Sequence, residues 1–229
     1  MNTQQFILDK YHLRPRNKQY VDIPNTNRET LAQLFFEMGF TKGAEVGVER
    51  GMYSEILLRN NPNLHLYSID AWRAYKGYRD HVTQEACDAL FQETAHRLAP
   101  YQDRNTLIRK YSMEAIGDFE DESLDFVYID ANHEFQHVVD DICEWQKKVK
   151  VGGIVAGHDY IYRKGNEYLM HVPYALQGYI DSYYIKPVFV LGRKSQVEGE
   201  LRDRPRSWFY VKPIPTPIKP HKDTLTNKV

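Results

Sequence analysis

Residues 43–51 read Gly-Ala-Glu-Val-Gly-Val-Glu-Arg-Gly, and this stretch decides the fold. Its first half is a short apolar run, which is typical of a buried strand, and residues 52–59 continue with a helical pattern. Gly47 and Gly51 allow the backbone to turn tightly and a ligand to approach closely. The N–H groups of the helix that follows are free to face an anion. The stretch therefore indicates a strand–loop–helix unit with a ligand at the carboxyl edge of a parallel sheet.

Strand and helix patterns alternate outward from this unit. We expect strands at residues 43–48, 64–69, 106–109, 124–129 and 154–157, and two further strands at 187–191 and 208–212 that pair antiparallel. This order predicts an α/β fold: a doubly wound, Rossmann-like seven-stranded sheet, mostly parallel with a reversed last strand, with helices on both faces. We place an N-terminal arm at 1–26, the domain at 27–212, a helical insertion that caps the site at 72–100, and a disordered tail at 213–229.

The composition narrows the class of partner and the compartment. The 229 residues include 30 basic and 31 acidic side chains, so no net field attracts nucleic acid or an anionic membrane. We therefore predict a small-molecule acceptor, with no nucleic acid and no membrane as partners. No segment approaches the roughly 18 apolar residues of a spanning helix. Cys87 and Cys143 have no metal-type spacing and fit a reducing compartment, which predicts a soluble, cytoplasmic protein.

The acidic residue that ends the second strand completes a cofactor site. The carboxylate of Asp70 suits a ribose, because it can accept hydrogen bonds from both hydroxyls of the diol. The loop has the spacing Gly47-x-x-x-Gly51 rather than the Gly-x-Gly-x-x-Gly of dinucleotide-binding proteins. Without that pyrophosphate cradle, the better ligand is a nucleoside with a smaller anionic group, such as an amino-acid carboxylate.

These motifs resemble those of class I S-adenosylmethionine-dependent methyltransferases. Glu45-x-Gly47-x-x-x-Gly51 is similar to the first motif of the family, and Asp70 to its ribose-binding acid. Ser112-Met113 resembles the segment that flanks the adenine, and the two closing strands resemble the reversed seventh strand. The resemblance implies S-adenosylmethionine as cofactor, and a homodimer, since related enzymes often form dimers. It implies that the cofactor is bound by Glu45, Gly47, Val48, Gly51, Asp70, Ala71, Ser112, Met113 and Asp130.

Two further motifs carry the chemistry. Asp130-Ala131-Asn132-His133 follows the fourth strand, and His158-Asp159 follows the fifth, so adjacent strands should bring these side chains together. In one reading, Asp130 and Asp159, with His158 or Asn132, hold Mg²⁺ or another divalent cation. In the other, His133 or His158 is the general base, with Asp130 beside it.

The family resemblance bears on both readings. Asp130 and Asp159 match metal-binding aspartates of catechol-type and macrolide-sugar-type O-methyltransferases. The match is partial, because catechol-type enzymes have Asp-Asn and sugar-type enzymes Asp-Asp where this chain has Asp159-Tyr160 and His158-Asp159. We expect the pair Asp140-Asp141 to lie on a solvated helix face.

The predicted function is O-methylation of a small molecule, a saccharide or a secondary metabolite. Aromatic walls suit such acceptors, and the candidates are Trp72, Tyr75, Tyr78, Tyr160, Tyr162 and Tyr168. Two alternatives use the same scaffold: a hydroxylase-like enzyme with iron bound by the His and Asp cluster, and a non-catalytic nucleoside-binding module.

Overall fold

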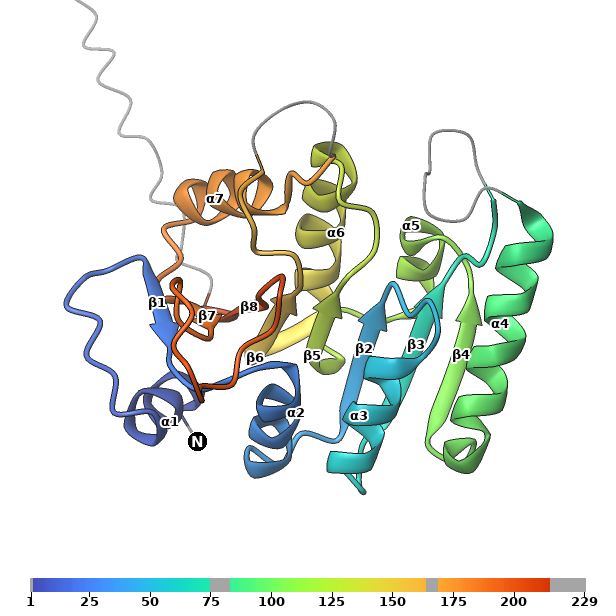
Figure 1. Ribbon diagram of the computed structural model, residues 1–229, viewed down its shortest axis with the longest axis horizontal. Coiled ribbons are helices and arrows are strands. Elements are labelled where there is room, and N and C mark those ends of the chain that lie inside the picture. Colours follow the sequence, from blue (N-terminus) through green and yellow to red (C-terminus); the bar gives the residue numbers. More distant parts are fainter. Residues whose placement is uncertain (1, 75–82, 164–168, 215–229) are drawn as a thin grey trace, which may run out of the picture.

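The structure is a computed structural model, and it describes residues 2–74, 83–163 and 169–214. Within these residues a sheet of eight strands runs in the order β1-β7-β8-β6-β5-β2-β3-β4 (Figure 1). The strands are β1 (Tyr20–Ile23), β2 (Lys42–Val46), β3 (His65–Asp70), β4 (Asn105–Arg109), β5 (Leu124–Ile129), β6 (Val149–Gly157), β7 (Val188–Leu191) and β8 (Trp208–Val211).

The strand directions confirm the predicted doubly wound sheet with a reversed last strand. β8 is antiparallel to both neighbours, β6 and β7, whereas every other neighbouring pair is parallel. From β2 the chain adds strands in one direction, first β3 and then β4. From β5 it adds them in the opposite direction, beginning with β6. The strand order therefore reverses between β2 and β5, which is where open α/β sheets bind their ligands.

Helices cover both faces of the sheet, as predicted. The α-helices are α1 (Thr3–Lys10), α2 (Arg28–Glu37), α3 (Met52–Asn60), α4 (Gln84–Leu98), α5 (Ser112–Ala115), α6 (Phe135–Lys148) and α7 (Val172–Ser182), with 3₁₀ turns at Ala99–Tyr101 and Ile116–Asp118. One core joins α1, α2 and α3 to the sheet around Phe35, Leu57 and Phe126. The other joins α6 and α7 to the opposite face around Trp145 and Leu176. No helix among the described residues is long and apolar enough to cross a membrane.

The strand count is one higher than the predicted seven. The additional strand, β1, lies within the segment predicted as an N-terminal arm and pairs in parallel with β7, with Val21 opposite Phe189. Ile7 of α1 and Ile23 of β1 are fully buried in the core. β1 is only four residues long and contains Asp22, so its apolar pattern is too short to be recognised in the sequence.

The predicted helical insertion contains α4, which connects β3 to β4 and packs against α3. It is therefore the regular crossover helix between these two parallel strands rather than an extra helix over the site. Its first half still contributes to the site, because Cys87 and Leu90 line the cavity described below. Residues 75–82, between Trp72 and α4, lie outside the described residues.

Candidate active site

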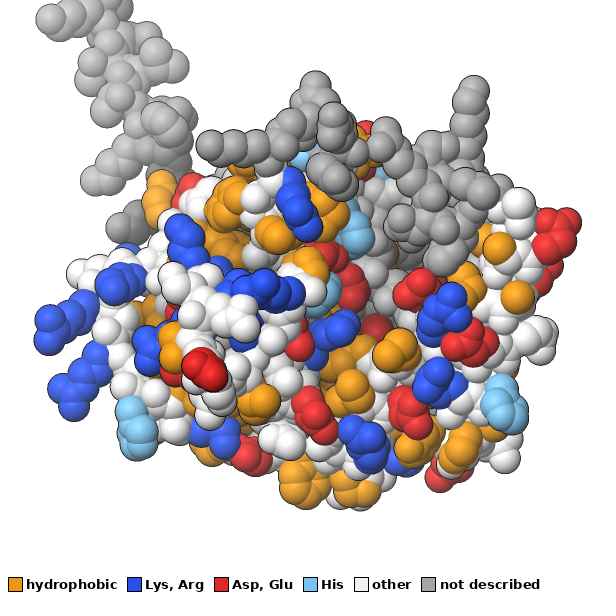
Figure 2. All heavy atoms as spheres, in the orientation of Figure 1, with side chains coloured by type: hydrophobic (Ala, Val, Ile, Leu, Met, Phe, Trp, Pro, Cys, Tyr) orange, Lys and Arg blue, Asp and Glu red, His pale blue; other side chains and the backbone are white. Residues whose placement is uncertain are grey.

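A cavity of about 640 Å³ lies at the carboxyl ends of the central strands. Acidic and histidine side chains gather near the middle of the face that Figure 2 shows. The loops after β2, β3, β4 and β5 all contribute to the wall of the cavity. Of the predicted site residues, the cavity is lined by Glu45, Gly47, Val48, Asp70, Ala71, Trp72, Ser112, Met113, Asp130 and His133.

The glycine loop after β2 is shaped by its neighbours. Gly47 has φ +91°, and a Cβ on it would lie 2.1 Å from the backbone oxygen of Asp130. Only glycine therefore allows the loops after β2 and β5 to touch. Gly51, with φ +72°, is the N-cap residue of α3, and a Cβ there would meet Thr94 and Leu98 of α4. Gly51 does not line the cavity, so its observed role is to fit the loop against α4.

Asp70 fixes the same loop through hydrogen bonds to the backbone. Its Oδ2 accepts from the N–H groups of Val48 at 3.0 Å and Glu49 at 2.9 Å, and its Oδ1 accepts from Trp72 N–H at 2.9 Å. The indole Nε1–H of Trp72 donates to the backbone oxygen of Glu49 at 2.8 Å. Trp72, predicted as an acceptor wall, is thus a buried support of the loop that also lines the cavity.

Glu45 is a buried carboxyl group at the floor of the cavity. It accepts a hydrogen bond from the hydroxyl of Ser54, which lies 3.0 Å from the hydroxyl of Ser68. Burial raises the pKa of Glu45 to about 8, although the bond from Ser54 opposes the shift. The carboxyl is therefore largely protonated at neutral pH when the cavity holds no cation.

The segment after β4 brings a second buried carboxyl group to the cavity. The hydroxyl of Ser112 donates to Asp141 of α6 and accepts the indole N–H of Trp145 at 2.7 Å. Asp141 is only 3% exposed, so the expectation that it lies on a solvated helix face is wrong. Its inward position follows from the packing of α6 beside α5, which the sequence pattern of α6 alone does not reveal.

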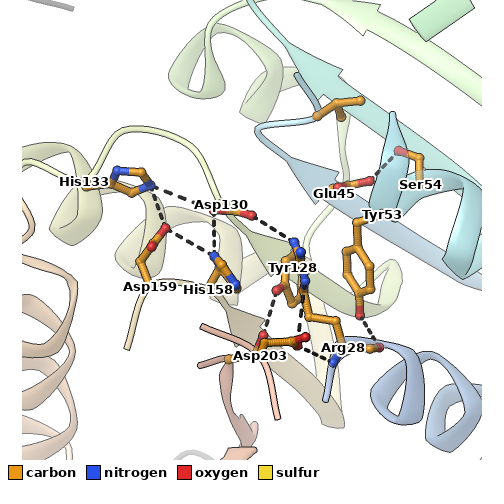
Figure 3. Close-up of polar contacts among 12 residues, drawn as sticks. Arg28, Glu45, Tyr53, Ser54, Tyr128, Asp130, His133, His158, Asp159 and Asp203 are labelled. Carbon is orange, nitrogen blue, oxygen red and sulfur yellow. Dashed lines mark hydrogen bonds and ion pairs between the residues drawn. The ribbon is translucent and has the colours of Figure 1, made fainter. Parts of the chain in front are cut away.

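The two predicted chemical motifs converge as expected (Figure 3). His133 Nε2 lies 2.8 Å from Asp159 Oδ2 and 3.8 Å from Asp130 Oδ1. His158 Nδ1 lies 3.3 Å from Asp159 Oδ2 and 3.6 Å from Asp130 Oδ1. We call Asp130, His133, His158 and Asp159 the catalytic cluster. Asp130 and His133 line the cavity, and His158 and Asp159 stand behind them.

Charges within the catalytic cluster are strongly coupled. Burial alone would lower the pKa of His133, but Asp130 and Asp159 raise it to about 10. The pKa of His158 is raised in the same way, against its burial, by Asp159 and Asp130. Burial would raise the pKa of Asp159, but contacts with His133 and His158 hold it well below its usual range. Two carboxylates in this site therefore require neighbouring positive charge.

Arg28 is a site residue that the sequence reasoning missed. It lines the cavity, and its guanidinium lies 3.7 Å from Asp130 Oδ2 and 3.8 Å from Asp203 Oδ2 (Figure 3). Its backbone N–H also donates to Asp203 at 2.7 Å. Arg28 is the first residue of α2, where the helix dipole disfavours a cation, and this unfavourable position was the available signal.

The predicted aromatic walls are only partly described. Tyr75, Tyr78 and Tyr168 lie outside the described residues. Tyr160 and Tyr162, after β6, do not line the cavity but form a row of ring contacts. The centroids lie 5.5 Å apart for Tyr20 and Tyr160, 5.8 Å for Tyr160 and Tyr162, and 5.4 Å for Tyr162 and Tyr174.

With this geometry in view, comparison with known proteins identifies the family. Residues 44–160, slightly more than half of the chain, match a family model described as a methyltransferase domain. The chain therefore belongs to this methyltransferase family. It is a class I S-adenosylmethionine-dependent methyltransferase, as the motif resemblance predicted. No curated protein matches it significantly.

Solved structures with the same fold include several methyltransferases. The O-methyltransferase TomG from Streptomyces achromogenes, involved in tomaymycin synthesis and bound to S-adenosylmethionine, has a TM-score of 0.57 and 10% identity, over 93% of this chain and 86% of TomG. An O-methyltransferase from Bacillus cereus in complex with S-adenosylhomocysteine has a TM-score of 0.56 and 15% identity, over 92% and 87%. An rRNA methylase from Streptococcus thermophilus has a TM-score of 0.55 and 12% identity, over 80% and 95%. At these identities the likeness shows the fold.

Proposed function

We propose that the cavity binds S-adenosylmethionine and that the chain methylates an oxygen atom of a small molecule, a saccharide or a secondary metabolite. The observation that carries this proposal is the continuity of the cavity. It extends from Ser112 and Met113, past Asp70, to Asp130 and His133 of the catalytic cluster. Its volume of about 640 Å³ is ordinary for a small-molecule ligand site. One cavity thus joins the cofactor motifs to a cluster of titratable groups.

The residues along the cavity fit the parts of the cofactor. Oδ1 of Asp70 accepts only one backbone N–H group and retains a lone pair for a ribose hydroxyl, whereas Oδ2 already accepts two. Glu45 suits the methionine end, because a cationic ammonium beside a buried carboxyl favours its ionised form. Gly47 and Val48 offer close backbone contact, Ala71, Ser112 and Met113 flank the base, and Gly51 holds the loop in place.

The catalytic cluster also fits a divalent cation. One ligand atom from each of Asp130, His133 and Asp159 lies within 4.8 Å of the others. This set contains His133, whereas the sequence-based prediction combined His158 with the two aspartates. A divalent cation in such a site lowers the pKa of a nearby acceptor hydroxyl, which makes the oxygen a better nucleophile. The two carboxylates would hold the cation, and His158 would orient Asp159 from behind.

The protonation of His133 bears on the choice between cation and histidine base. With a pKa of about 10, the imidazole of His133 already carries a second proton at neutral pH and has no lone pair to accept another. The pKa of His158 is shifted in the same direction. These shifts favour the cation reading over a lone histidine base. In the absence of a cation, the imidazolium of His133 offsets part of the negative charge of Asp130 and Asp159.

The nature of the acceptor rests on three observations. The net charge of −1 argues against a polyanion. The rings of Tyr162 and Tyr174 are about half exposed and offer flat apolar faces, which suit sugars and phenols. TomG, a structural neighbour, is an O-methyltransferase involved in tomaymycin synthesis. The cluster of two imidazoles and two carboxylates would also suit iron, as in the hydroxylase-like alternative.

A calorimetric titration with S-adenosylhomocysteine, with and without Mg²⁺, tests the proposal. We expect micromolar binding that is lost in Asp70→Ala and partly kept in Asp70→Asn, because the amide retains one oxygen acceptor. Circular dichroism would check that both variants fold. A tighter or cation-dependent titration would support the cation reading. Absence of binding to folded wild-type protein, or iron bound without any affinity for the nucleoside, would overturn the proposal.

A further inference from the structure

Asp141 is a buried titratable group that the proposed chemistry does not use. It lies in the second turn of α6, is 3% exposed and lines the cavity. The other inward residues of this helix are apolar: Val138, Ile142 and Trp145. A carboxylate in such a position is costly unless hydrogen-bond donors satisfy it. Its presence at the cavity wall calls for a ligand that supplies a donor.

The protein supplies a donor to one oxygen of this carboxyl group. Oδ1 accepts the hydroxyl proton of Ser112, and Ser112 is itself held by the indole N–H of Trp145. Among the described residues, Oδ2 has no hydrogen-bond donor. Ser112 and Trp145 therefore fix the orientation of Asp141 and leave a second acceptor at the cavity. The group is placed like a recognition residue rather than like a helix-surface residue.

The position of Asp141 relative to the cofactor indicates what it faces. Asp70 ends β3, Ser112 follows the neighbouring strand β4, and both line the same cavity. A nucleoside with its ribose at Asp70 therefore has space for its base beside Ser112. Asp141 contacts Ser112 directly, at that end of the cavity. This step rests on the proposed function, because it takes the cofactor to be an adenine nucleoside.

We infer that Asp141 recognises the exocyclic amino group of the adenine, with Oδ2 accepting one of its N–H groups. A carboxylate has no proton to give, so a base with a 6-oxo group would place two acceptors against each other. A site built in this way discriminates strongly against the analogue that lacks the donor. Asp141 is then a specificity-determining residue, and Ser112 and Trp145 position it.

The pKa of Asp141 agrees with this role. Burial raises the pKa of Asp141 to about 7, with the bond from Ser112 acting in the opposite direction. A further N–H donor from a ligand would favour the ionised form and compensate for its burial.

The test compares the affinities of S-adenosylhomocysteine and S-inosylhomocysteine, which has a 6-oxo group, by calorimetry at pH 8. We expect the wild type to prefer the adenine compound by about tenfold or more, the size of one charge-assisted hydrogen bond. In Asp141→Asn the carboxamide can donate to the 6-oxo group, so the preference should vanish or reverse. Asp140→Asn, which removes the neighbouring carboxylate, should keep the wild-type preference.

Each outcome decides the inference. Equal affinity of the wild type for the two nucleosides would overturn it without any variant, so it does not depend on the folding of Asp141→Asn. An undiminished preference in folded Asp141→Asn, or its loss in Asp140→Asn alone, would also overturn it. Failure of the wild type to bind either nucleoside would instead remove the proposed cofactor site.

Discussion

At the scale of single residues, the contact between Gly47 and Asp130 ties the cofactor loop to the catalytic cluster. The backbone N–H of Asp130 donates to Val46 at 2.7 Å, and Gly47 leaves no room for a side chain above the backbone of Asp130. The position of the reactive carboxylate therefore depends on the same backbone contact as the cofactor loop. A change in one should be detected in the other.

Gly47→Ala tests this contact. The added Cβ would lie 2.1 Å from the oxygen of Asp130, at a backbone φ of +91°, so the loops must separate. We expect a loss of unfolding free energy of at least about 1–2 kcal/mol and loss of S-adenosylhomocysteine binding. Gly178→Ala in α7, where a Cβ meets nothing within 4 Å, is the control and should be neutral or stabilising. Wild-type stability and affinity in Gly47→Ala would contradict the expectation.

Asp159→Asn tests the charge coupling in the catalytic cluster. Asp159 lies 2.8 Å from His133 and 3.3 Å from His158, and its negative charge helps to raise the pKa of both imidazoles. We expect the variant to lower both pKa values by about one unit or more in metal-free protein. Nuclear magnetic resonance titration of the imidazole protons would measure this. Asp140→Asn should leave both pKa values unchanged. An unaltered pKa of His133 in Asp159→Asn would refute the coupling.

The residues that the sequence could predict are those at strand ends. Asp70, Asp130 and Asp159 follow apolar runs, and parallel strands place their carboxyl ends at one edge, so their convergence follows from local pattern. Arg28 and Asp141 could not be predicted in this way. Their places depend on the packing of α2 beside the β7–β8 connection and of α6 beside α5, and these contacts join distant segments. The choice of His133 rather than His158 in the converging ligand set depends on side-chain geometry.

At the scale of elements, seven of the eight strands and all the longer crossover helices followed from periodicity. Buried strands such as β5, which is buried at every position, give clear apolar runs. β1 was missed because a four-residue edge strand with one polar residue carries little signal. The role of α4 was misjudged because its length suggested an insertion, whereas the connection between parallel strands required it.

Ile7→Ala tests whether the N-terminal segment is part of the domain core. The side chain of Ile7 in α1 is fully buried, so its truncation leaves a cavity beside the sheet. We expect a loss of about 2–4 kcal/mol of unfolding free energy, measured by urea denaturation. Ile214→Ala removes the same atoms from a side chain that is 78% exposed and should change stability by less than about 0.5 kcal/mol. Equal effects of the two substitutions would show that α1 is a detachable arm.

At the scale of the whole molecule, three groups that line the cavity bind protons more tightly in the folded chain than in the unfolded chain. Their pKa values are raised to about 8 for Glu45, about 7 for Asp141 and about 10 for His133. Each group contributes stability that is complete below its unfolded pKa and is lost as the pH rises through its folded pKa. The windows are 4.5 to about 8, 3.8 to about 7, and 6.5 to about 10.

We therefore expect the ligand-free, metal-free protein to lose stability as the pH rises from 5.5 to 9. Urea denaturation should show a decrease of at least about 1.4 kcal/mol, equivalent to one pKa unit. The unfolding free energy of the Glu45→Gln variant should decrease less over the same pH interval, because the substitution removes one of the three titrating groups. Asp159, whose pKa is depressed, acts in the opposite direction but only at acidic pH. A stability that increases from pH 5.5 to 9 would contradict these shifts.

The place of β8 in the sheet has a consequence for the order in which the ribosome delivers the chain. Among the described strands β8 is synthesised after all the others, yet it lies inside the sheet, hydrogen-bonded to β6 on one side and β7 on the other. When residues 1–200 have left the ribosome, the strands from β2 to β6 can pair with one another. The pair formed by β1 and β7 cannot yet join them, because β8 lies between β7 and β6 in the sheet. Asp203, which receives the backbone N–H of Arg28, emerges just before this strand. The reactive end of the cavity is therefore completed only after Asp203 has emerged, and a chain stalled before β8 would expose the open edges of β6 and β7.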